Sequence, residues 1–271
     1  MKRIVTIQDI SCLGKCSLTV ALPIISAMGI EASIIPTAVL SAHTIFEGHT
    51  FKDLTDEITP ISEHWKKEGF DFDAIYTGYL GSEKQIEIVA KFFDDFKDDG
   101  NFVYVDPVMA DGGILYPHFD GGFVEKMKWL CSKADVISPN LTEAAFLTGQ
   151  QYKKDYDFEY IKEIVYSLVD IGAKNVILTG IALDGKYGIL SYDGREFDYF
   201  THEKIDRVFY GTGDVFSSVC VGALTQGKSL KQAVKTAGDF TLECIKASVR
   251  NPDTRYYGVD FETVLHTLYE K

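Results

Sequence analysis

Short segments that are apolar throughout recur along the sequence, and segments with helical spacing separate most of them. A strand covered on only one face alternates apolar and polar residues, so runs without alternation are typical of strands covered on both faces. The intervening helical patterns include residues 17–28 and 82–96. This order predicts an α/β fold that is doubly wound, with a mainly parallel sheet and helices on both faces. The strand-like runs stand at residues 3–8, 32–36, 74–77, 102–105, 136–138 and 176–179.

The last third of the sequence departs from this alternation. The turn dipeptide Asp193-Gly194 lies between strand-like runs at 187–192 and 196–201, which predicts a late β-hairpin. Two long helices should follow, at 214–226 and 229–249. No Pro/Ser-rich linker, charge block or repeat interrupts the 271 residues, so we expect a single domain over residues 1–271.

The charge and the apolar content limit the class of partner. A formal net charge of −13 disfavours non-specific binding to nucleic acid or to an anionic membrane, because both need a basic surface. No apolar stretch approaches the roughly 20 residues that span a bilayer, and the apolar run near Met1 ends too early for a signal peptide. The five cysteines form no CxxC pair and suit reduced thiols. We therefore expect a soluble, cytoplasmic protein with small-molecule ligands.

Two glycines and an aspartate precede a stretch of small and apolar residues, in the run Gly211-Thr212-Gly213-Asp214. Glycines let the backbone approach a ligand closely, and the free N–H groups at a helix start can hold phosphoryl oxygens. A carboxylate suits such a site if it accepts a proton from an attacking alcohol. Asp214 is thus a candidate catalytic base, and an N-cap after a glycine-rich turn is the alternative.

Acidic side chains also follow two of the predicted strands, where ligands of doubly wound sheets bind. Asp106 ends one strand and precedes a proline, and Asn140 and Glu143 stand three residues apart at a helix start. Carboxylates of this kind can help hold Mg²⁺, a hard cation that keeps several waters. Two alternatives stay open, namely a helix cap made by Asn140 and Glu143 and a solvated strand-end charge at Asp106.

Five further blocks occur in order ahead of the glycine turn, and with it they resemble the pyridoxal/pyridoxamine kinase branch of the ribokinase-like superfamily. The blocks are residues 7–18, 38–44, 77–82, 104–109 and 138–144; motifs of the last two also occur in related hydroxymethylpyrimidine kinases. The resemblance implies ATP as phosphoryl donor, with Mg²⁺, a monovalent cation such as K⁺, and a homodimer. It implies Asp214 as base, Gly211, Thr212 and Gly213 as anion hole, Asp106 and Glu143 at the metal, and Asn140 in the nucleotide motif.

For the substrate, the resemblance implies a pocket lined by Asp9, Thr44 and Tyr79, with His43 close by. A flat heteroaromatic ring needs an aromatic cover on one face and a few polar groups that fix its orientation. Ordinary packing is the alternative for Tyr79, and a satisfied core histidine is the alternative for His43.

Two more residues, Thr179 at a strand end and Phe209 before the glycine turn, are candidates for contacts to ATP. Ordinary loop and strand-end packing is the alternative for both of them.

Asp9 departs from the pattern of the resembled family, since many pyridoxal kinases carry serine at this point. Their following GxxGN stretch reads Gly14-Lys15-Cys16-Ser17-Leu18 here. A carboxylate favours a protonated ring nitrogen or an amine, which predicts a preference for pyridoxamine.

These observations predict a kinase that uses Mg-ATP to phosphorylate the hydroxymethyl group of a B6 vitamer. Pyridoxamine, pyridoxine or pyridoxal would give the 5′-phosphate and ADP, in vitamin B6 salvage. One alternative is a kinase for hydroxymethylpyrimidine or another small alcohol. Another is a non-catalytic vitamer-binding protein, against which the retention of Asp214 beside the glycine turn argues.

Two further segments bear on the site. The run Gly222–Ser229 matches the P-loop pattern GxxxxGK[ST], but a P-loop follows a strand and opens a helix, whereas this run ends an apolar helix. Gly227 as a C′ residue and a capping box of Ser229 with Gln232 indicate helix-turn-helix instead.

Residues 111–122, bracketed by Asp-Gly-Gly runs, could close over the site as a lid.

Overall fold

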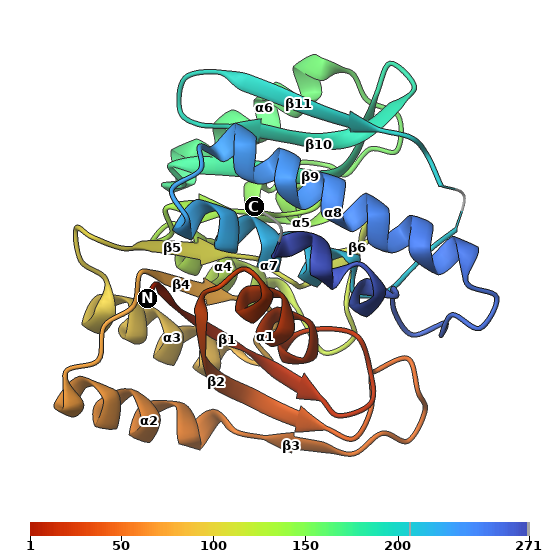
Figure 1. Ribbon diagram of the computed structural model, residues 1–271. Coiled ribbons are helices and arrows are strands. Elements are labelled where there is room, and N and C mark those ends of the chain that lie inside the picture. Colours follow the sequence, from red (N-terminus) through yellow and green to blue (C-terminus); the bar gives the residue numbers. More distant parts are fainter. Residues whose placement is uncertain (206, 270–271) are drawn as a thin grey trace.

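The computed structural model describes every residue except 206, 270 and 271. Among the described residues, nine strands form one sheet in the order β11-β10-β9-β8-β5-β4-β1-β2-β3 (Figure 1). The pairs between β9 and β2 in this order are parallel, whereas β3 and the β10–β11 ribbon are antiparallel to their neighbours. The strands are β1 (Arg3–Ser11), β2 (Glu31–Leu40), β3 (Phe51–Asp53), β4 (Ala74–Thr77), β5 (Phe102–Val105), β8 (Val136–Ile137), β9 (Asn175–Leu183), β10 (Lys186–Tyr192) and β11 (Phe197–His202).

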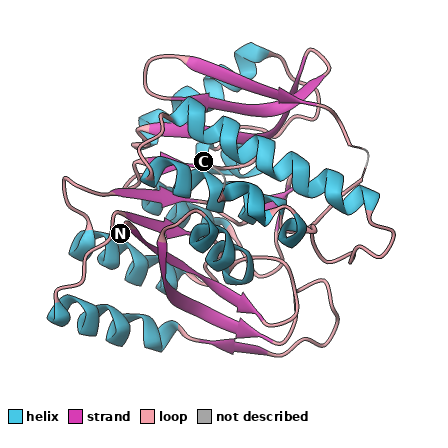
Figure 2. Cartoon of the chain, viewed as in Figure 1, coloured by secondary structure: helices cyan, strands magenta, loops and turns pink. Residues whose placement is uncertain are grey.

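Helices cover both faces of the sheet, as Figure 2 shows. Side chains of successive strand residues point to opposite faces, so Ile4 and Tyr76 pack under the first group of helices while Val5 and Ile75 pack under the second. The doubly wound α/β fold with a mainly parallel sheet is thus confirmed. The first group is α1 (Leu18–Ala27), α7 (Thr212–Thr225) and α8 (Leu230–Arg250), and the second is α2 (Thr55–Glu68), α3 (Glu83–Phe96), α4 (Gly121–Cys131), α5 (Leu141–Thr148) and α6 (Phe158–Ile171).

The late hairpin is present as β10 and β11. A second hairpin, between β9 and β10, was not predicted and closes through Asp184-Gly185. Both turn residues have positive φ (51° and 74°), the backbone that two-residue hairpin turns require and that an Asp-Gly dipeptide favours. An Asp-Gly dipeptide, the sequence signal of a hairpin turn, therefore stands on both sides of β10.

The segment 222–229 has the helix-turn-helix structure expected of it. Helix α7 ends at Thr225, Gly227 has φ +88°, and Ser229 forms a capping box with Gln232 at the start of α8. The P-loop interpretation is thus excluded by the backbone. Between β5 and α4, the strands β6 (Ala110–Asp111) and β7 (Ile114–Leu115) form a small separate sheet.

The parallel strands bring their carboxyl ends to one edge of the sheet. In Figure 1 the arrowheads of β1 and β2 point to the side where the chain returns from α8 toward the short helix η1 (Phe261–Thr263). A final short helix, η2 (Leu265–Leu268), follows. None of the helices in the described part of the chain combines the length and apolar character needed to cross a membrane.

Candidate active site

The glycine turn before α7 shapes the floor of the candidate site. Gly211 is the N-cap of α7 with φ +74°, and a Cβ added there would lie 1.9 Å from the carbonyl oxygen of Lys15. Only glycine fits both the conformation and the space. A Cβ added at Gly213 would meet nothing within 4 Å, so the space in front of the first helical turn is open. The first N–H groups of α7, including those of Thr212 and Gly213, have no partner within the helix and face a space that can receive an anion.

Asp214 stands in the first turn of the same helix and is half-buried. Burial, and then the negative charge of Asp106, raise its pKa to about 7, while a hydrogen bond from the backbone N–H of Ser17 opposes the rise. A carboxylate with this pKa is partly deprotonated near neutral pH and can accept a proton.

Asp106 directly follows β5, and its side chain is only 8% exposed. The hydroxyl of Ser217 donates to its Oδ2 at 2.8 Å, and burial raises its pKa to about 7. Ser217 lies three residues after Asp214, on a neighbouring position of α7. One helix therefore carries the candidate base and also holds the candidate metal ligand. Sequence reasoning missed Ser217, although its i+3 spacing from Asp214 was a usable signal.

Asn140 and Glu143 form a capping box at the start of α5. The carboxylate of Glu143 accepts the backbone N–H groups of Asn140 (2.8 Å) and Met109 (3.1 Å), and the amide of Asn140 donates to the carbonyl of Ala110 at 2.8 Å. Both residues thus fix the segment that follows Asp106. Burial and the charge of Asp106 raise the pKa of Glu143 well above its ordinary value. Metal binding by Glu143 and nucleotide binding by Asn140 stay predictions.

Asp9 approaches the site from β1, at an irregularity in the register between β1 and β2. Such bulges re-aim a side chain. Its Oδ1 accepts the hydroxyl of Ser17 at 2.5 Å, and its Oδ2 accepts that of Ser11 at 3.2 Å. Burial raises the pKa of Asp9. Burial and then the charge of Asp9 also raise the pKa of Tyr79, which places the two predicted pocket residues within electrostatic reach of each other.

His43 and Thr44 lie in the loop after β2. The Nδ1 of His43 accepts the backbone N–H of Ile45 at 3.2 Å, and its ring lies 5.2 Å from that of Tyr210, the residue before the glycine turn. Burial and the nearby His49 lower the pKa of His43, which favours a neutral imidazole at pH 7. Thr44 is exposed.

The two predicted ATP contacts come from β9 and from the segment just before the glycine turn. Thr179 pairs with Asn140 through a parallel bridge and donates its N–H to the carbonyl of Pro139 at 3.0 Å. Phe209 is buried, and the guanidinium of Arg207 lies 4.8 Å from its ring centroid. Both have the packing role that was their alternative, and their contacts to ATP stay predictions.

Comparison with known proteins shows which protein family the chain belongs to. A family model described as phosphomethylpyrimidine kinase matches residues 22–257, which includes all the acidic residues above except Asp9. The chain belongs to the phosphomethylpyrimidine kinase family. It is accordingly a phosphotransferase.

Solved structures of the family extend the comparison. A "putative phosphomethylpyrimidine kinase" of Bacteroides thetaiotaomicron, crystallised with pyridoxal, is 42% identical with a TM-score of 0.93, over 98% of this chain and 95% of that one. A pyridoxal kinase of Staphylococcus aureus in complex with AMP-PCP is 27% identical with a TM-score of 0.83, over 100% and 95%. The predicted resemblance to the pyridoxal kinase branch of the ribokinase-like superfamily is confirmed.

The names of the relatives are divided between two substrates. A hydroxymethylpyrimidine/phosphomethylpyrimidine kinase of Aquifex aeolicus is 35% identical over 67% of this chain and 70% of that protein. Membership of the kinase family therefore fixes the type of reaction but leaves the alcohol to be identified.

The acidic residues fit a metal ion that a kinase receives together with its nucleotide. Oδ1 of Asp106 has no hydrogen-bond partner in the described part of the chain, and no group of three or more His, Cys, Asp or Glu residues there could hold a metal alone. Mg²⁺ needs only one or two carboxylates when phosphate oxygens and water complete its shell. Burial raises the pKa values of Asp106, Glu143 and Asp214, and the charge of Asp106 adds to the rise at the other two; a bound cation would favour the ionised carboxylates.

Sequence reasoning singled out residues 14–18 as part of a family block but missed that this loop packs against the kinase's glycine turn. Cys16 and Ser17 lie there beside Asp214, and burial together with the charges of Asp214 and Asp9 raises the pKa of Cys16 to about 12. Its thiol is therefore neutral and unsuited to act as a nucleophile.

Proposed function

We propose that this kinase transfers the γ-phosphoryl group of Mg-ATP to the hydroxymethyl group of a B6 vitamer, giving the 5′-phosphate and ADP. The observation that carries the proposal is Asp214, a carboxylate with a pKa of about 7 beside the open start of α7. Efficient general bases have a pKa near the operating pH. A carboxylate at an anion site is otherwise unfavourable, so its presence is best explained by proton transfer.

In this mechanism Asp214 accepts the proton of the substrate alcohol as the alcohol oxygen attacks the phosphoryl group. The N–H groups of Gly211, Thr212 and Gly213 stabilise the charge on the moving phosphoryl oxygens. Asp106 and Glu143 are the side chains that would hold Mg²⁺, which neutralises the triphosphate when it is bound. The dependence on K⁺ and the homodimer stay predictions.

The substrate ring would lie between Tyr79 and the neutral imidazole of His43, with Asp9 as its polar partner. Pyridoxal bound to the Bacteroides relative supports a pyridine substrate. Asp9 favours a protonated ring nitrogen or an amine, because a positive partner would compensate a carboxylate that burial now disfavours. We therefore propose pyridoxamine as the preferred vitamer.

Replacing Asp9 tests this preference. In Asp9→Ser, the ratio of kcat/KM for pyridoxamine over pyridoxal should fall by about tenfold, the size of a lost charge-assisted hydrogen bond. Asp9→Asn keeps the shape and the acceptor oxygen and should lower the same ratio. The ratio cancels losses common to both substrates, so an unchanged ratio in both variants would refute the preference.

Hydroxymethylpyrimidine is the second candidate, since the name of the Aquifex relative includes it and the family model is described by the related phosphomethylpyrimidine. Its amino group beside a ring nitrogen is also a partner that a carboxylate can bind. Incubating the protein with Mg-ATP and each alcohol, followed by mass analysis, separates the cases. We expect the vitamer phosphates from the wild type and no product from Asp214→Asn, which should still bind ATP. Phosphorylation of hydroxymethylpyrimidine alone would favour the second candidate, and bound vitamer without product would favour a binding protein.

A further inference from the structure

Ser17 has a backbone conformation that serine seldom adopts. Its φ is +50° and its ψ is −131°, a region where Cβ clashes with the backbone and where glycine is the usual residue. Three non-glycine residues in the described part of the chain have positive φ, namely Ser17, His118 and Asp184. Ser17 is the buried one, at 6% exposure. Strain of this kind persists only where surrounding contacts hold it.

The hydrogen bond from the Ser17 hydroxyl to Asp9 holds Ser17 in this conformation. Ser17 is the N-cap of α1, and its carbonyl accepts the N–H groups of Val20 and Ala21. Serine at this position normally accepts a helix N–H through its hydroxyl, but this one forms no cap bond. The hydroxyl instead donates to Asp9 at 2.5 Å.

The backbone of the same loop contacts the catalytic turn at two points. The carbonyl of Lys15 and the Cα of Cys16 pack against Gly211, so closely that a Cβ there would lie 1.9 Å and 3.8 Å from them, and the backbone N–H of Ser17 favours the charged form of Asp214, which lowers the pKa of that carboxyl. A loop placed in this way fixes the carboxylate relative to the helix start.

We propose that Ser17 is a positioning residue for the base: Asp9 holds it in a glycine-type conformation, and that conformation directs its backbone N–H to Asp214. The inference rests on the proposed role of Asp214. It connects the substrate side of the site to the base. Asp9, the proposed polar partner of the vitamer, also fixes the loop that orients Asp214.

Two substitutions separate a backbone role from a side-chain role. Ser17→Ala keeps the Cβ that disfavours positive φ and removes the hydroxyl that holds it, so the N–H should move away from Asp214. We expect kcat to fall by about tenfold, the order of magnitude of one lost hydrogen bond to a charged group. Ser17→Gly also lacks the hydroxyl but adopts positive φ freely, so its kcat should stay within about twofold of the wild type. Ser26→Ala, an exposed serine of α1, should behave as the wild type.

The pH profile gives a second readout that a merely structural loss would not move. The groups that act on Asp214 or respond to its charge are Asp106, Asp9, Cys16, Tyr76 and Tyr116. Loss of the Ser17 N–H removes a donor to the charged form, so the acid limb of kcat/KM should move to higher pH in Ser17→Ala and stay in place in Ser17→Gly.

The outcomes decide the proposal in each case. Wild-type turnover in Ser17→Ala, or a loss in Ser17→Gly as large as in Ser17→Ala, would overturn it, the latter because the hydroxyl itself would then be the required group. If Ser17→Ala fails to fold by circular dichroism, loss of activity in a folded Ser17→Gly still overturns it and retained activity supports it. Asp214→Asn is measured alongside. Turnover by that variant would refute the proposed function of Asp214 as base, which is a different failure from that of the positioning role of Ser17.

Discussion

Asp106 and Asp214 determine the electrostatics of the site at the scale of single residues. Asp106 is buried and Asp214 half-buried; burial raises the pKa of each to about 7, and the charge of Asp106 contributes to the value at Asp214. Since the base works only when deprotonated, kcat/KM of the wild type should rise with pH and level off above an apparent pKa of about 7.

Asp106→Asn tests the interaction between the two carboxylates. Removing a neighbouring negative charge favours ionised Asp214, so its pKa falls and the acid limb of kcat/KM should shift to lower pH. The overall rate should also drop, since a candidate magnesium ligand is lost. A limb that stays in place, measured at saturating Mg²⁺, would show that Asp214 is not the group that titrates.

The two glycines of the turn should respond differently to the same substitution. Gly211→Ala places a Cβ against the Lys15 carbonyl at positive φ, so we expect the free energy of unfolding to fall by about 2–4 kcal/mol, with loss of activity. Gly213→Ala meets open space, so its melting temperature should stay near that of the wild type while kcat falls, because the methyl group enters the space reserved for the phosphoryl group. Full activity of Gly213→Ala would argue against this location of the anion hole.

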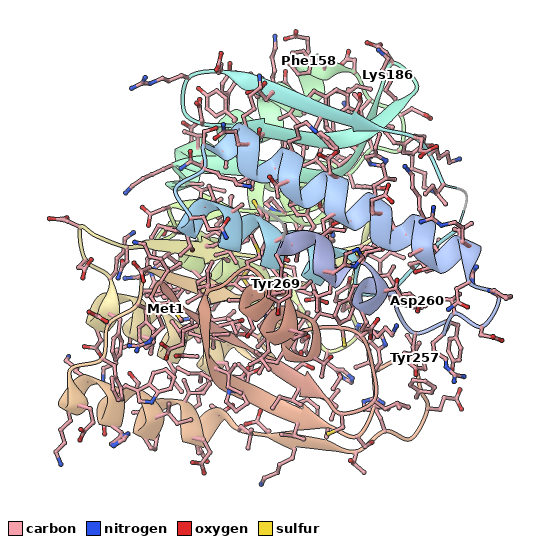
Figure 3. All side chains as sticks on the ribbon, viewed as in Figure 1. Met1, Phe158, Lys186, Tyr257, Asp260 and Tyr269 are labelled. Atoms are coloured by element: carbon pink, nitrogen blue, oxygen red, sulfur yellow. The ribbon has the colours of Figure 1, made fainter. Side chains whose placement is uncertain are left out.

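At the scale of elements, the segment between α8 and η1 joins two loops of the site. Figure 3 shows Tyr257 and Asp260 on this segment. Lys15 forms ion pairs of 2.9 Å with Asp260 and Glu262, and the ring of Phe46, in the loop after β2, lies 5.7 Å from that of Tyr257. The segment therefore fixes both the loop over the glycine turn and the loop that carries His43 and Thr44.

Lys15→Met should release the first of these loops. Methionine keeps the packing of the aliphatic stem but leaves the buried Asp260 without its cation, which should cost about 1–3 kcal/mol after allowance for partial exposure. The matched control is Lys162→Met, which breaks an exposed pair with Glu159 and should change stability by less than about 0.5 kcal/mol. Chemical denaturation measures both, and kcat below the melting transition should fall only in Lys15→Met. Equal effects in the two variants would contradict the role of the segment.

Elements with strong local patterns could be predicted from the sequence, and elements defined by tertiary pairing could not. The strands 74–77 and 102–105 occur at their predicted positions, and the helices around the turn at 226–229 differ from prediction by one or two residues. By contrast, β3 and the small β6–β7 sheet have only two or three residues each, too few for a period to appear. Their existence depends on hydrogen bonds to a partner strand that no local pattern encodes.

The same distinction applies to the site. Asp106, Glu143 and Asp214 stand at strand ends or helix starts, so the parallel topology alone predicts that they share one edge. Ser17 and Ser217 act through contacts to Asp9 and Asp106 that join distant parts of the chain. Serine is common at helix starts and inside small-residue helices, and composition does not distinguish these two from ordinary packing.

At the scale of the whole molecule, a chain with a net charge of −13 repels a triphosphate electrostatically, and a kinase must overcome this repulsion to bind ATP. The start of α7 supplies a local positive potential, but the acidic residues around it oppose the binding of ATP without a cation. We therefore expect Mg²⁺ and ATP to bind together far more tightly than ATP binds alone.

Thermal unfolding of the whole chain tests this expectation. Mg-ATP at about 100 times its Kd should add about 2.7 kcal/mol to the free energy of unfolding, roughly 5 °C or more in Tm. ATP with EDTA should raise Tm much less, since the charges of Asp106, Glu143 and Asp214 then stay uncompensated. Mg²⁺ alone should also give only a small shift, because the described residues contain no group that could hold a metal without phosphate oxygens. A full shift with Mg²⁺ alone would instead indicate a pre-formed metal site, and the metal would then have to bind before the nucleotide.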